Sequence, residues 1–277
     1  MLTIRDLVQT DEVEQVVELE QEVWGVSDRD VTPVTHLVAA REAGGILLGA
    51  FDGAVLAGFV YGFVGYEQLE ITLHSHMLAV KPAYRKRNLG YRLKLAQREQ
   101  ALAKGIKRMT WTFDPLQSLN AYFNFCKLGV VANLYKINLY GESTSSFLHR
   151  SGTDRLWVNW QLASMRVKNR LETQPKCNAG DLEAIYINDA PLPLIRVGED
   201  ESPIINDNNE SLTRSQALIE IPASIDELQE SKPGSGSKWR EATRQAFSAA
   251  LAAGFTVEEF YRSGGEGRPY GAYLLRK

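Results

Sequence analysis

The strongest constraint on how this chain can fold is a basic loop at residues 80–93, VKPAYRKRNLGYRL, which separates two different periodic patterns. Residues 70–80 before it have the pattern and length of a strand, which Pro82 stops. Residues 90–104 after it repeat apolar side chains at helical spacing, and Gly105 ends that helix. A loop between a strand and a helix start directs backbone N–H groups and the positive helix end at one point. The sequence therefore predicts an anion-binding site in this loop.

The elements around the loop follow the order of a sheet with helices packed on it. Asp52-Gly53 lies between two apolar runs, GILLGAF and AVLAGFVYGF, and predicts a tight β-hairpin. Thr32 and Pro33 predict the cap and first position of a helix that ends at Gly44. The other predicted elements are a strand at 2–5, a helix at 10–23, a strand at 106–113, a helix at 119–128 and strands at 130–140 and 156–162. This order predicts an α/β (α+β) fold with a mixed sheet, complete by about residue 165.

The chain of 277 residues is long enough for about two domains. We expect one domain at residues 1–165 and a smaller α/β extension at 166–277, which opens with a polar linker at about 166–181. Within the extension, the pattern predicts strands at 182–187 and 192–197, an acidic loop at 198–213, a helix at 238–253 and strands at 255–262 and 270–275.

Charge is distributed unevenly along the chain. The net charge is −3, yet residues 81–108 hold ten basic residues against one acid, Glu99. A local basic block in an acidic protein favours a small anionic ligand over a nucleic acid. We therefore expect no nucleic-acid partner.

The remaining composition predicts a cytoplasmic protein without membrane spans. No apolar run approaches the roughly 20 residues that a transmembrane helix needs. Cys126 and Cys177 are too few for a disulfide framework, so we expect both to be reduced thiols, with Cys126 buried. The four histidines show no metal-ligand spacing, and we expect no metal (His36, His74, His76 and His149).

The basic loop resembles the acyl-CoA loop of the GNAT superfamily of N-acetyltransferases, V-x-P-x-x-[R/Q]-x-x-G-x-[G/A]-x-x-L. The one departure is Asn88, which stands where the first glycine is expected, and asparagine tolerates a left-handed backbone. The element order over residues 1–165 is similar to the GNAT fold, and residues 120–129, NAYFNFCKLG, are similar to its helix ending in (Y/F)-x-K-L-G. Residues 73–93 and the run WTFDPLQSLNAYFNFCKLG further resemble a predicted bacterial GNAT family with a long C-terminal extension.

This resemblance implies a mostly antiparallel, twisted sheet and an acyl-CoA co-substrate, acetyl-CoA first of all, without a metal. It implies direct transfer of the acyl group to an amine, which we expect on a small-molecule acceptor, and by analogy a possible homodimer. The implied cofactor-binding residues are Leu78, Ala79, Val80, Arg85, Lys86, Arg87, Asn88, Leu89, Gly90, Tyr91 and Asn120.

Candidates for the base that deprotonates the acceptor lie on the strand before the loop. His74 and His76 share one face of a strand, and an unperturbed histidine pKa of about 6.5 suits a base at neutral pH. Histone-type members of the superfamily carry a glutamate at the position that matches His74. The structural alternative is a pair of histidines hydrogen-bonded to their neighbours. Glu70 is a further candidate, acting through a water molecule.

The general acid is where the sequence departs from the resemblance. GNAT enzymes often protonate the leaving thiolate with a tyrosine at the position that Phe125 occupies, and phenylalanine has no proton to give. Tyr122, one turn earlier, is the substitute candidate, although a packed aromatic is its structural alternative. Two functions stay open: an acyl-CoA-dependent N-acyltransferase, or a catalytically weak or inactive acyl-CoA-binding regulatory protein.

Several other charged residues have structural and functional interpretations. Asp114 is expected to cap the following helix or to face the acceptor. The run Thr153-Asp154-Arg155 is expected to form a turn with a local ion pair. Arg240 and Arg244 share a helical face, where they are either solvated or able to hold an acidic acceptor.

Overall fold

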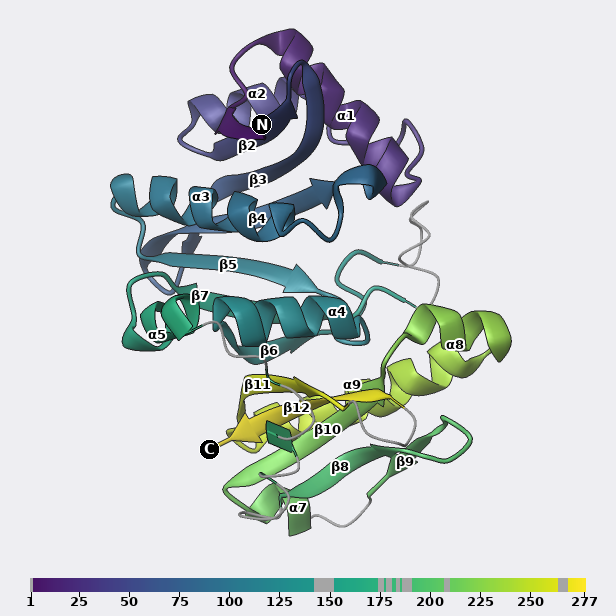
Figure 1. Ribbon diagram of the computed structural model, residues 1–277. Coiled ribbons are helices and arrows are strands. Elements are labelled where there is room, and N and C mark those ends of the chain that lie inside the picture. The colour runs from purple at the N-terminus through teal and green to yellow at the C-terminus, as the bar shows by residue number, and fades with distance from the viewer. Residues whose placement is uncertain are drawn as a thin grey trace. The chain divides into compact units, whose positions relative to one another are not determined.

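The computed structural model describes residues 2–141, 152–173, 177, 181–182, 185, 191–206, 210–263 and 269–277. Its internal contacts divide the described residues into two compact units, the first formed by residues 2–111 and the second by residues 112–141 with the described residues from 152 onwards (Figure 1). These units differ from the expected domains, 1–165 and 166–277, which remain a prediction.

The first unit contains a five-stranded sheet in the order β1-β2-β3-β4-β5. Its first four strands pair antiparallel, and β5 pairs parallel with β4. The strands are β1 (Thr3–Asp6), β2 (Ile46–Asp52), β3 (Val55–Glu67), β4 (Glu70–Val80) and β5 (Arg108–Phe113), and the helices are α1 (Thr10–Trp24), α2 (Val34–Glu42), η1 (Pro82–Tyr84) and α3 (Leu89–Ala103). The predicted order of elements is confirmed in this unit.

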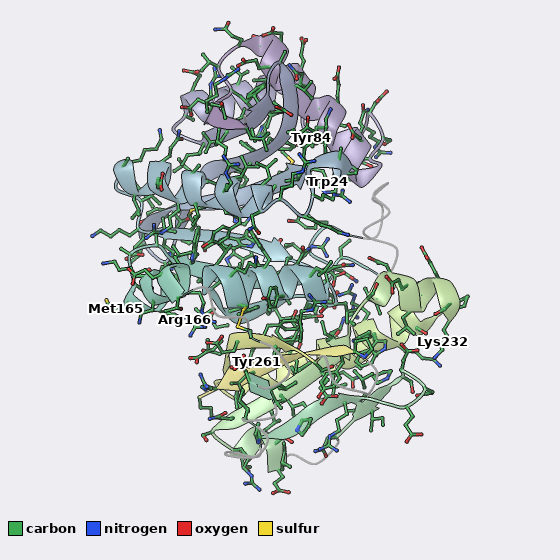
Figure 2. The ribbon with its side chains drawn as sticks, in the orientation of Figure 1. Trp24, Tyr84, Met165, Arg166, Lys232 and Tyr261 are labelled. Atoms are coloured by element: carbon green, nitrogen blue, oxygen red, sulfur yellow. A yellow bond between two sulfur atoms is a disulfide. The ribbon has the colours of Figure 1, made fainter. Side chains whose placement is uncertain are left out.

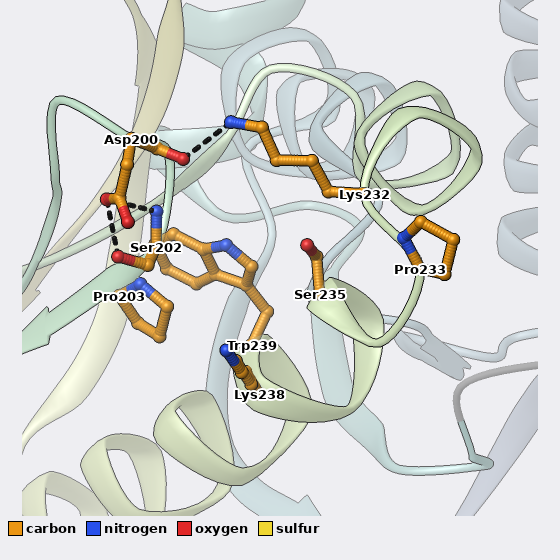
Figure 3. Close-up of a pocket in the computed structure, with 8 residues that line it drawn as sticks. All are labelled: Asp200, Ser202, Pro203, Lys232, Pro233, Ser235, Lys238 and Trp239. Carbon is orange, nitrogen blue, oxygen red and sulfur yellow. Dashed lines mark hydrogen bonds between the residues drawn. The ribbon is translucent and has the colours of Figure 1, made fainter.

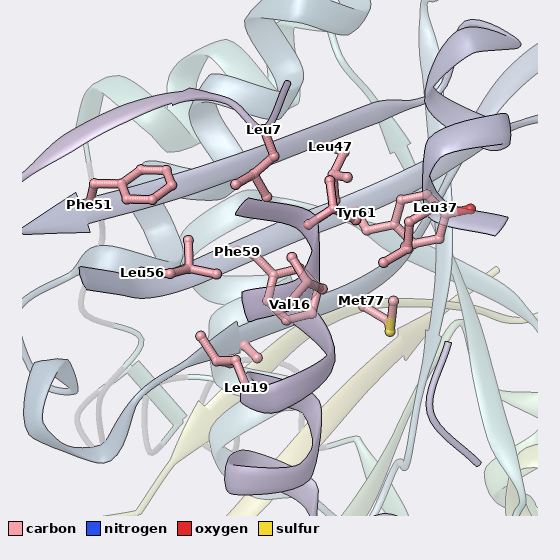
Figure 4. Close-up of a cluster of buried hydrophobic side chains, with 12 residues drawn as sticks. Leu7, Val16, Leu19, Leu37, Leu47, Phe51, Leu56, Phe59, Tyr61 and Met77 are labelled. Carbon is pink, nitrogen blue, oxygen red and sulfur yellow. The ribbon is translucent and has the colours of Figure 1, made fainter. Parts of the chain in front are cut away.

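Helices cover both faces of this sheet. Met77 and Ala79 of β4 belong to the hydrophobic core under α1 and α2 (Figure 4). A side chain at Gly90 of α3 would instead meet Leu78 and Val80. Successive residues of a strand point to opposite faces. Therefore α1 and α2 cover one face of β4, and α3 covers the other.

The core under α1 follows from its sequence period. Val13, Val16 and Leu19 are fully buried and recur every three residues along one face of the helix. They pack against Phe59 and Tyr61 of β3, which are also fully buried (Figure 4). Each such side chain contributes about 1.5–3 kcal/mol on burial.

The second unit has a seven-stranded sheet in the order β7-β6-β11-β12-β10-β8-β9. All of its assigned strand pairs are antiparallel except β8–β10. Its elements are α4 (Ser118–Ala121), the π-helix η2 (Tyr122–Leu128), β6 (Val131–Lys136), β7 (Arg155–Gln161), α5 (Met165–Thr173), β8 (Leu192–Val197), β9 (Pro203–Ile205), α7 (Glu210–Thr213), β10 (Gln216–Pro222), α8 (Ile225–Ser231), α9 (Ser235–Ala252), β11 (Thr256–Arg262) and β12 (Tyr270–Arg276). Both sheets fit the predicted α/β (α+β) class with mostly antiparallel pairing.

The prediction of a linker at residues 166–181 is wrong for its first half, which forms α5. This short helix buries Val167, and its Arg166 and Arg170 both bind the carboxylate of Glu259 on β11. The polar composition of the segment therefore reflects ion pairing and not a free linker. The predicted strand at 182–187 falls mostly outside the described residues, and Leu182 itself is helical.

The prediction of two reduced thiols is also wrong. Cys126 of η2 and Cys177 form a disulfide with their Cα atoms 6.1 Å apart, visible as the yellow bond in Figure 2. Both residues are buried in the second unit. They lie 51 positions apart in the sequence, so their spacing alone could not reveal the pair. Among the described helices, none is long and apolar enough to cross a membrane.

Candidate active site

The basic loop adopts the backbone geometry that the sequence predicts. Asn88 immediately precedes α3 and has a left-handed conformation, with φ 57° and ψ 19°. Asparagine occupies this region more readily than other residues with a Cβ atom, so it replaces glycine here at small cost. The N–H groups of the first turn of α3 have no partner within the helix and are oriented to meet an anion.

Three consecutive cations surround this helix start. Arg85, Lys86 and Arg87 are exposed, and none of them forms an ion pair in the part of the chain that the structure describes. The Arg85 guanidinium donates a hydrogen bond from Nε to the Val80 carbonyl at 3.2 Å, and Arg87 lies over the ring of Tyr84 at 5.6 Å. Their charge is thus available for a bound polyanion.

One edge of β4 is open beside the loop. The parallel pairing of β4 with β5 covers Leu73–Met109 and His74–Thr110. The later residues of β4 pair with β3 on the opposite edge, as far as Val80 with Gly58. Backbone groups on the β5 side of Leu78, Ala79 and Val80 are therefore placed to pair with an extended ligand.

The N-terminus of α3 is held against this same stretch of β4. A Cβ atom at Gly90 would lie 3.7 Å from Cδ2 of Leu78. Leu89 is almost fully buried and anchors the helix, while partial burial raises the pKa of the Tyr91 hydroxyl. The predicted residues 85–91 and 78–80 thus lie on two adjoining elements of one unit.

A buried polar cluster fixes α3 on β4 farther along. Lys94 Nζ donates to Ser75 Oγ at 2.5 Å, and Ser75 Oγ donates to Gln97 Oε1 at 2.7 Å. The Lys94 ammonium also lies 3.7 Å from the ring centre of Trp111, and burial lowers its pKa well below the usual range. Since α3 carries the loop at its start, this cluster positions the anion site.

His74 and His76 lie on the same face of the sheet, as predicted. The pairing of β3 and β4 shifts between Tyr61–Met77 and Phe63–His74, which forms a bulge at Ser75 and His76. The two imidazole rings lie 6.1 Å apart, and both contact the ring of Phe63. His74 is buried, whereas His76 is exposed.

A hydrogen-bonded chain orients the His74 ring. Thr110 Oγ1 donates its only proton to Glu67 Oε1 at 2.7 Å and lies 3.1 Å from His74 Nδ1. His74 Nδ1 must therefore donate to Thr110, because the hydroxyl proton is already in use. In the neutral ring, Nε2 is then the nitrogen without a proton.

The surroundings of both histidines lower their pKa. Burial lowers the pKa of His74 to about 4, with smaller effects of the same direction from His76 and Lys94. It also lowers the pKa of His76, where we expect a smaller effect because this side chain is exposed. The ordinary value of about 6.5 assumed from the sequence does not hold for His74.

Glu67 is linked to His74 by hydrogen bonds through the Thr110 hydroxyl, and the sequence analysis did not predict this carboxylate. Glu70, the predicted candidate, is exposed and lies 3.8 Å from the Arg108 guanidinium. Glu67 pairs with Glu70 across the β3–β4 turn. Recognising a hairpin at this turn would have brought Glu67 into consideration.

A second acid that the sequence reasoning missed is Glu20 of α1. Its side chain is 2% exposed, Oε2 accepts a hydrogen bond from the Thr32 N–H at 3.0 Å, and Oε1 has no partner among the described residues. Burial raises the pKa of Glu20 to about 7. Thr32 in turn contacts Met77, and His76 contacts the ring of Tyr61 in the same core, so Glu20 lies on the same side of the sheet as His76.

Asn120, Tyr122 and Phe125, which the sequence analysis discussed as site positions, belong to the second unit. Phe125 is fully buried between the rings of Phe113 and Tyr273 and has a packing role. Tyr122 lies under the guanidinium of Arg262 at 5.7 Å, and Asn120 is exposed. The roles of Tyr122 as an acid and Asn120 as a cofactor ligand stay predictions.

The second unit also contains a small cavity of about 160 Å³, which no sequence pattern predicted (Figure 3). Trp239 forms part of its wall and donates from its ring nitrogen to the Glu201 carbonyl at 2.9 Å. Lys232 Nζ binds the Asp200 carbonyl at 2.7 Å and the Glu201 carboxylate at 3.0 Å. These contacts satisfy the polar groups of Trp239 and Lys232 within the protein. Among the residues described, no cluster of three or more histidine, cysteine or acidic side chains is placed to hold a metal ion.

Solved structures that match part of this chain include the ribosomal-protein-S18-alanine N-acetyltransferase from Escherichia coli, with 16% identity and a TM-score of 0.47 over 59% of this chain and 96% of that one. Another is an acetyltransferase of the GNAT family from Streptococcus pneumoniae, with 16% identity and a TM-score of 0.46 over 57% and 98% of the two chains. A third is the PaiA N-acetyltransferase from Thermoplasma acidophilum in complex with coenzyme A, with 17% identity and a TM-score of 0.41 over 58% and 99%.

A search of the curated proteins found no match. The model of the acetyltransferase (GNAT) family matches residues 11–126, which include β4, the basic loop and α3. Residues 11–126 of this chain are therefore a GNAT acetyltransferase domain.

Proposed function

We propose that this protein is an acyl-CoA-dependent N-acyltransferase that transfers an acyl group, in the first place acetyl, to an amine of a small molecule. The observation that carries the proposal is the exposed loop at residues 85–88 together with the start of α3. There, Asn88 holds a left-handed turn, and three cations lie beside it that form no ion pair with any described residue. This arrangement suits the pyrophosphate of coenzyme A.

The open edge of β4 supports a binding position for the pantetheine arm and the thioester beside this strand. Backbone N–H groups of Leu78, Ala79 and Val80 are proposed to pair with the pantetheine arm and to polarise the thioester carbonyl. Asn120 stays a proposed further contact. No metal takes part in this proposal.

In the proposed step, the acceptor nitrogen attacks the thioester carbonyl carbon, the carbon–sulfur bond breaks, and the electron pair leaves with sulfur. His76 is the proposed proton acceptor, because it is exposed and because its lowered pKa keeps it neutral at pH 7. His74 lies beside it, held by Thr110 and Glu67. Tyr122 stays the proposed proton donor to the thiolate.

The test is thiol release from acetyl-CoA in the presence of a panel of amines: amino acids, polyamines and amino sugars. With an active acceptor, His76→Ala should lower kcat by about 10²-fold or more, since a lost general base typically costs that much. The affinity of the His76→Ala variant for acetyl-CoA should equal that of the wild type. His36→Ala, another exposed histidine that contacts Tyr61, is the matched control and should keep its kcat.

An unchanged kcat in His76→Ala would exclude this histidine as the base. Saturable acetyl-CoA binding with no thiol release for any amine would contradict the enzyme and favour the acyl-CoA-binding regulatory protein. The cytoplasmic location and the homodimer stay predictions, and the disulfide is a bond more common in oxidising compartments.

A further inference from the structure

The second unit contains a buried cluster of charges that lies outside the proposed transfer site. Arg240 of α9 donates from both terminal nitrogens to Asp114, at 2.8 and 2.6 Å. Arg244, one turn later, donates to both oxygens of Asp154, at 2.9 and 3.0 Å. The two arginines predicted to be solvated or to bind an acidic acceptor are thus already occupied. Asp114 also accepts from the Leu116 N–H at 2.9 Å, within the turn before α4. Gln117 is the N-cap of α4, so the prediction that Asp114 caps this helix is wrong.

Arg155 is the exception in this cluster. It stands at the start of β7 and is 6% exposed, yet its guanidinium forms no ion pair with any carboxylate in the described part of the chain. Its one side-chain hydrogen bond to a described residue is from Nη1 to the Asp154 carbonyl at 2.9 Å. The local ion pair predicted for Thr153-Asp154-Arg155 is therefore wrong, because the Asp154 carboxylate binds Arg244.

The charges around Arg155 do not balance. Three guanidiniums, of Arg155, Arg240 and Arg244, face the carboxylates of Asp114 and Asp154, and the exposed carboxylate of Glu241 lies 3.9 Å from Arg244. Lys136 lies opposite Arg155 across the β6–β7 pair and adds a further positive charge. A buried charge without a counterion is costly, and burial accordingly lowers the pKa of Arg155.

The surroundings of this guanidinium suit a planar anion. Arg155 lies 5.3 Å from the ring centre of Tyr140, which is 42% exposed and so gives access from solvent. The Tyr140 hydroxyl lies 3.2 Å from Thr112 Oγ1 on β5, which adds a polar group beside the ring. Among the described residues, Arg155 Nε and Nη2 donate no hydrogen bond, so these nitrogens can bind a ligand.

We propose that Arg155, with Tyr140 beside it, is a binding site for the carboxylate of a small molecule. A carboxylate matches the planar guanidinium fork with two parallel hydrogen bonds. Its single negative charge also neutralises the excess positive charge of the cluster. This site requires no particular acyl donor and stands independently of the proposed transfer reaction.

The test is thermal unfolding of the full chain in increasing sodium acetate, with sodium chloride at equal ionic strength as the reference and inorganic phosphate as a second probe. A ligand that binds only the folded state raises the unfolding temperature, and this rise grows with the logarithm of the ligand concentration once that exceeds Kd. We expect acetate to stabilise the wild-type protein beyond chloride. Arg155→Met should lose this effect, whereas Arg276→Met, which removes an exposed arginine paired with Glu258, should keep it.

The proposal also predicts the stability of this variant in the absence of ligand. Arg155→Met should then be at least as stable as the wild type, because the substitution removes an unpaired buried charge. If Arg155 had a structural role, the same variant would be less stable than the wild type. Arg155→Lys keeps a charge but not the fork, and should bind acetate about tenfold more weakly. Equal effects of acetate and chloride on the wild type would overturn the proposal, as would stabilisation by phosphate alone or an acetate effect that survives in Arg155→Met.

Discussion

At the scale of single residues, the first unit holds two buried titratable groups with opposite effects of pH on stability. Burial lowers the pKa of His74 to about 4 and raises the pKa of Glu20 to about 7. As pH falls below 6.5, the unfolded chain protonates its His74 before the folded chain does, which lowers stability. Over the same range, the folded chain protonates Glu20 before the unfolded chain does, which raises stability.

We predict that His74→Asn removes part of the acid sensitivity of the fold. The amide can still donate to Thr110 but does not titrate. The stability of the wild type relative to this variant should be greatest above pH 6.5 and decrease by up to about 3 kcal/mol as pH falls to 4. Urea unfolding of both proteins between pH 4 and 7.5 measures this difference, and a difference that is independent of pH would refute the lowered pKa.

The sequence predicted which side chains share a face of one strand, but it did not predict hydrogen-bond partners that lie far apart in the chain. The shared face of His74 and His76 follows from strand alternation and is confirmed by their ring contact. The link from His74 to Glu67 passes through Thr110, 36 positions away, and no local pattern encodes it. Arg240 shares this limit, because its partner Asp114 lies 126 positions earlier.

At the scale of secondary-structure elements, the junction between the basic loop and α3 depends on one left-handed residue. Asn88→Gly should leave stability within about 0.5 kcal/mol of the wild type and should not weaken acetyl-CoA binding. Asn88→Val should cost about 1–2 kcal/mol, because a β-branched side chain is strained at φ 57°.

Urea unfolding and acetyl-CoA titration of both variants check this prediction. Equal stability of the valine variant would show that Asn88 does not hold the left-handed conformation. Weaker acetyl-CoA binding by Asn88→Gly would show that the asparagine side chain itself contributes to the site.

Element order was readable from the sequence, but the role of polar segments was not. The change of period at residues 80–93 predicted β4, the loop and α3 at nearly their observed positions. The sequence predicts a linker where α5 forms, because six of the nine residues of this helix are polar or charged, the exceptions being Met165, Val167 and Leu171. Its stability comes from the buried Val167 and from the ion pairs of Arg166 and Arg170 with Glu259, which are tertiary contacts.

At the scale of the whole molecule, the disulfide is the feature that composition alone misjudged. It closes a span of 51 residues in the second unit. In the loop-entropy description, a cross-link of this span stabilises the fold by about 4 kcal/mol. Two cysteines in a chain of this length are compatible with two free thiols or with one disulfide, and only the fold distinguishes them.

We therefore predict that Cys177→Ser lowers the free energy of unfolding by up to about 4 kcal/mol. Dithiothreitol should lower the unfolding temperature of the wild type and leave that of the variant unchanged. Thiol titration of the unreduced wild type in guanidinium should detect no free thiol. Two free thiols in this titration would show that the bond is absent.

The measurement that tests the proposed acyl-CoA site most directly is calorimetric titration of the full chain with acetyl-CoA. Gly90→Trp is the blocking variant, because its large side chain would project from the first turn of α3 beside Leu78 and Val80. Lys104→Ala, at the far end of the same helix, is the matched control. We predict saturable binding to the wild type and to Lys104→Ala, and no binding to Gly90→Trp. No binding to the wild type, or equal binding to all three proteins, would contradict an acyl-CoA site at this loop.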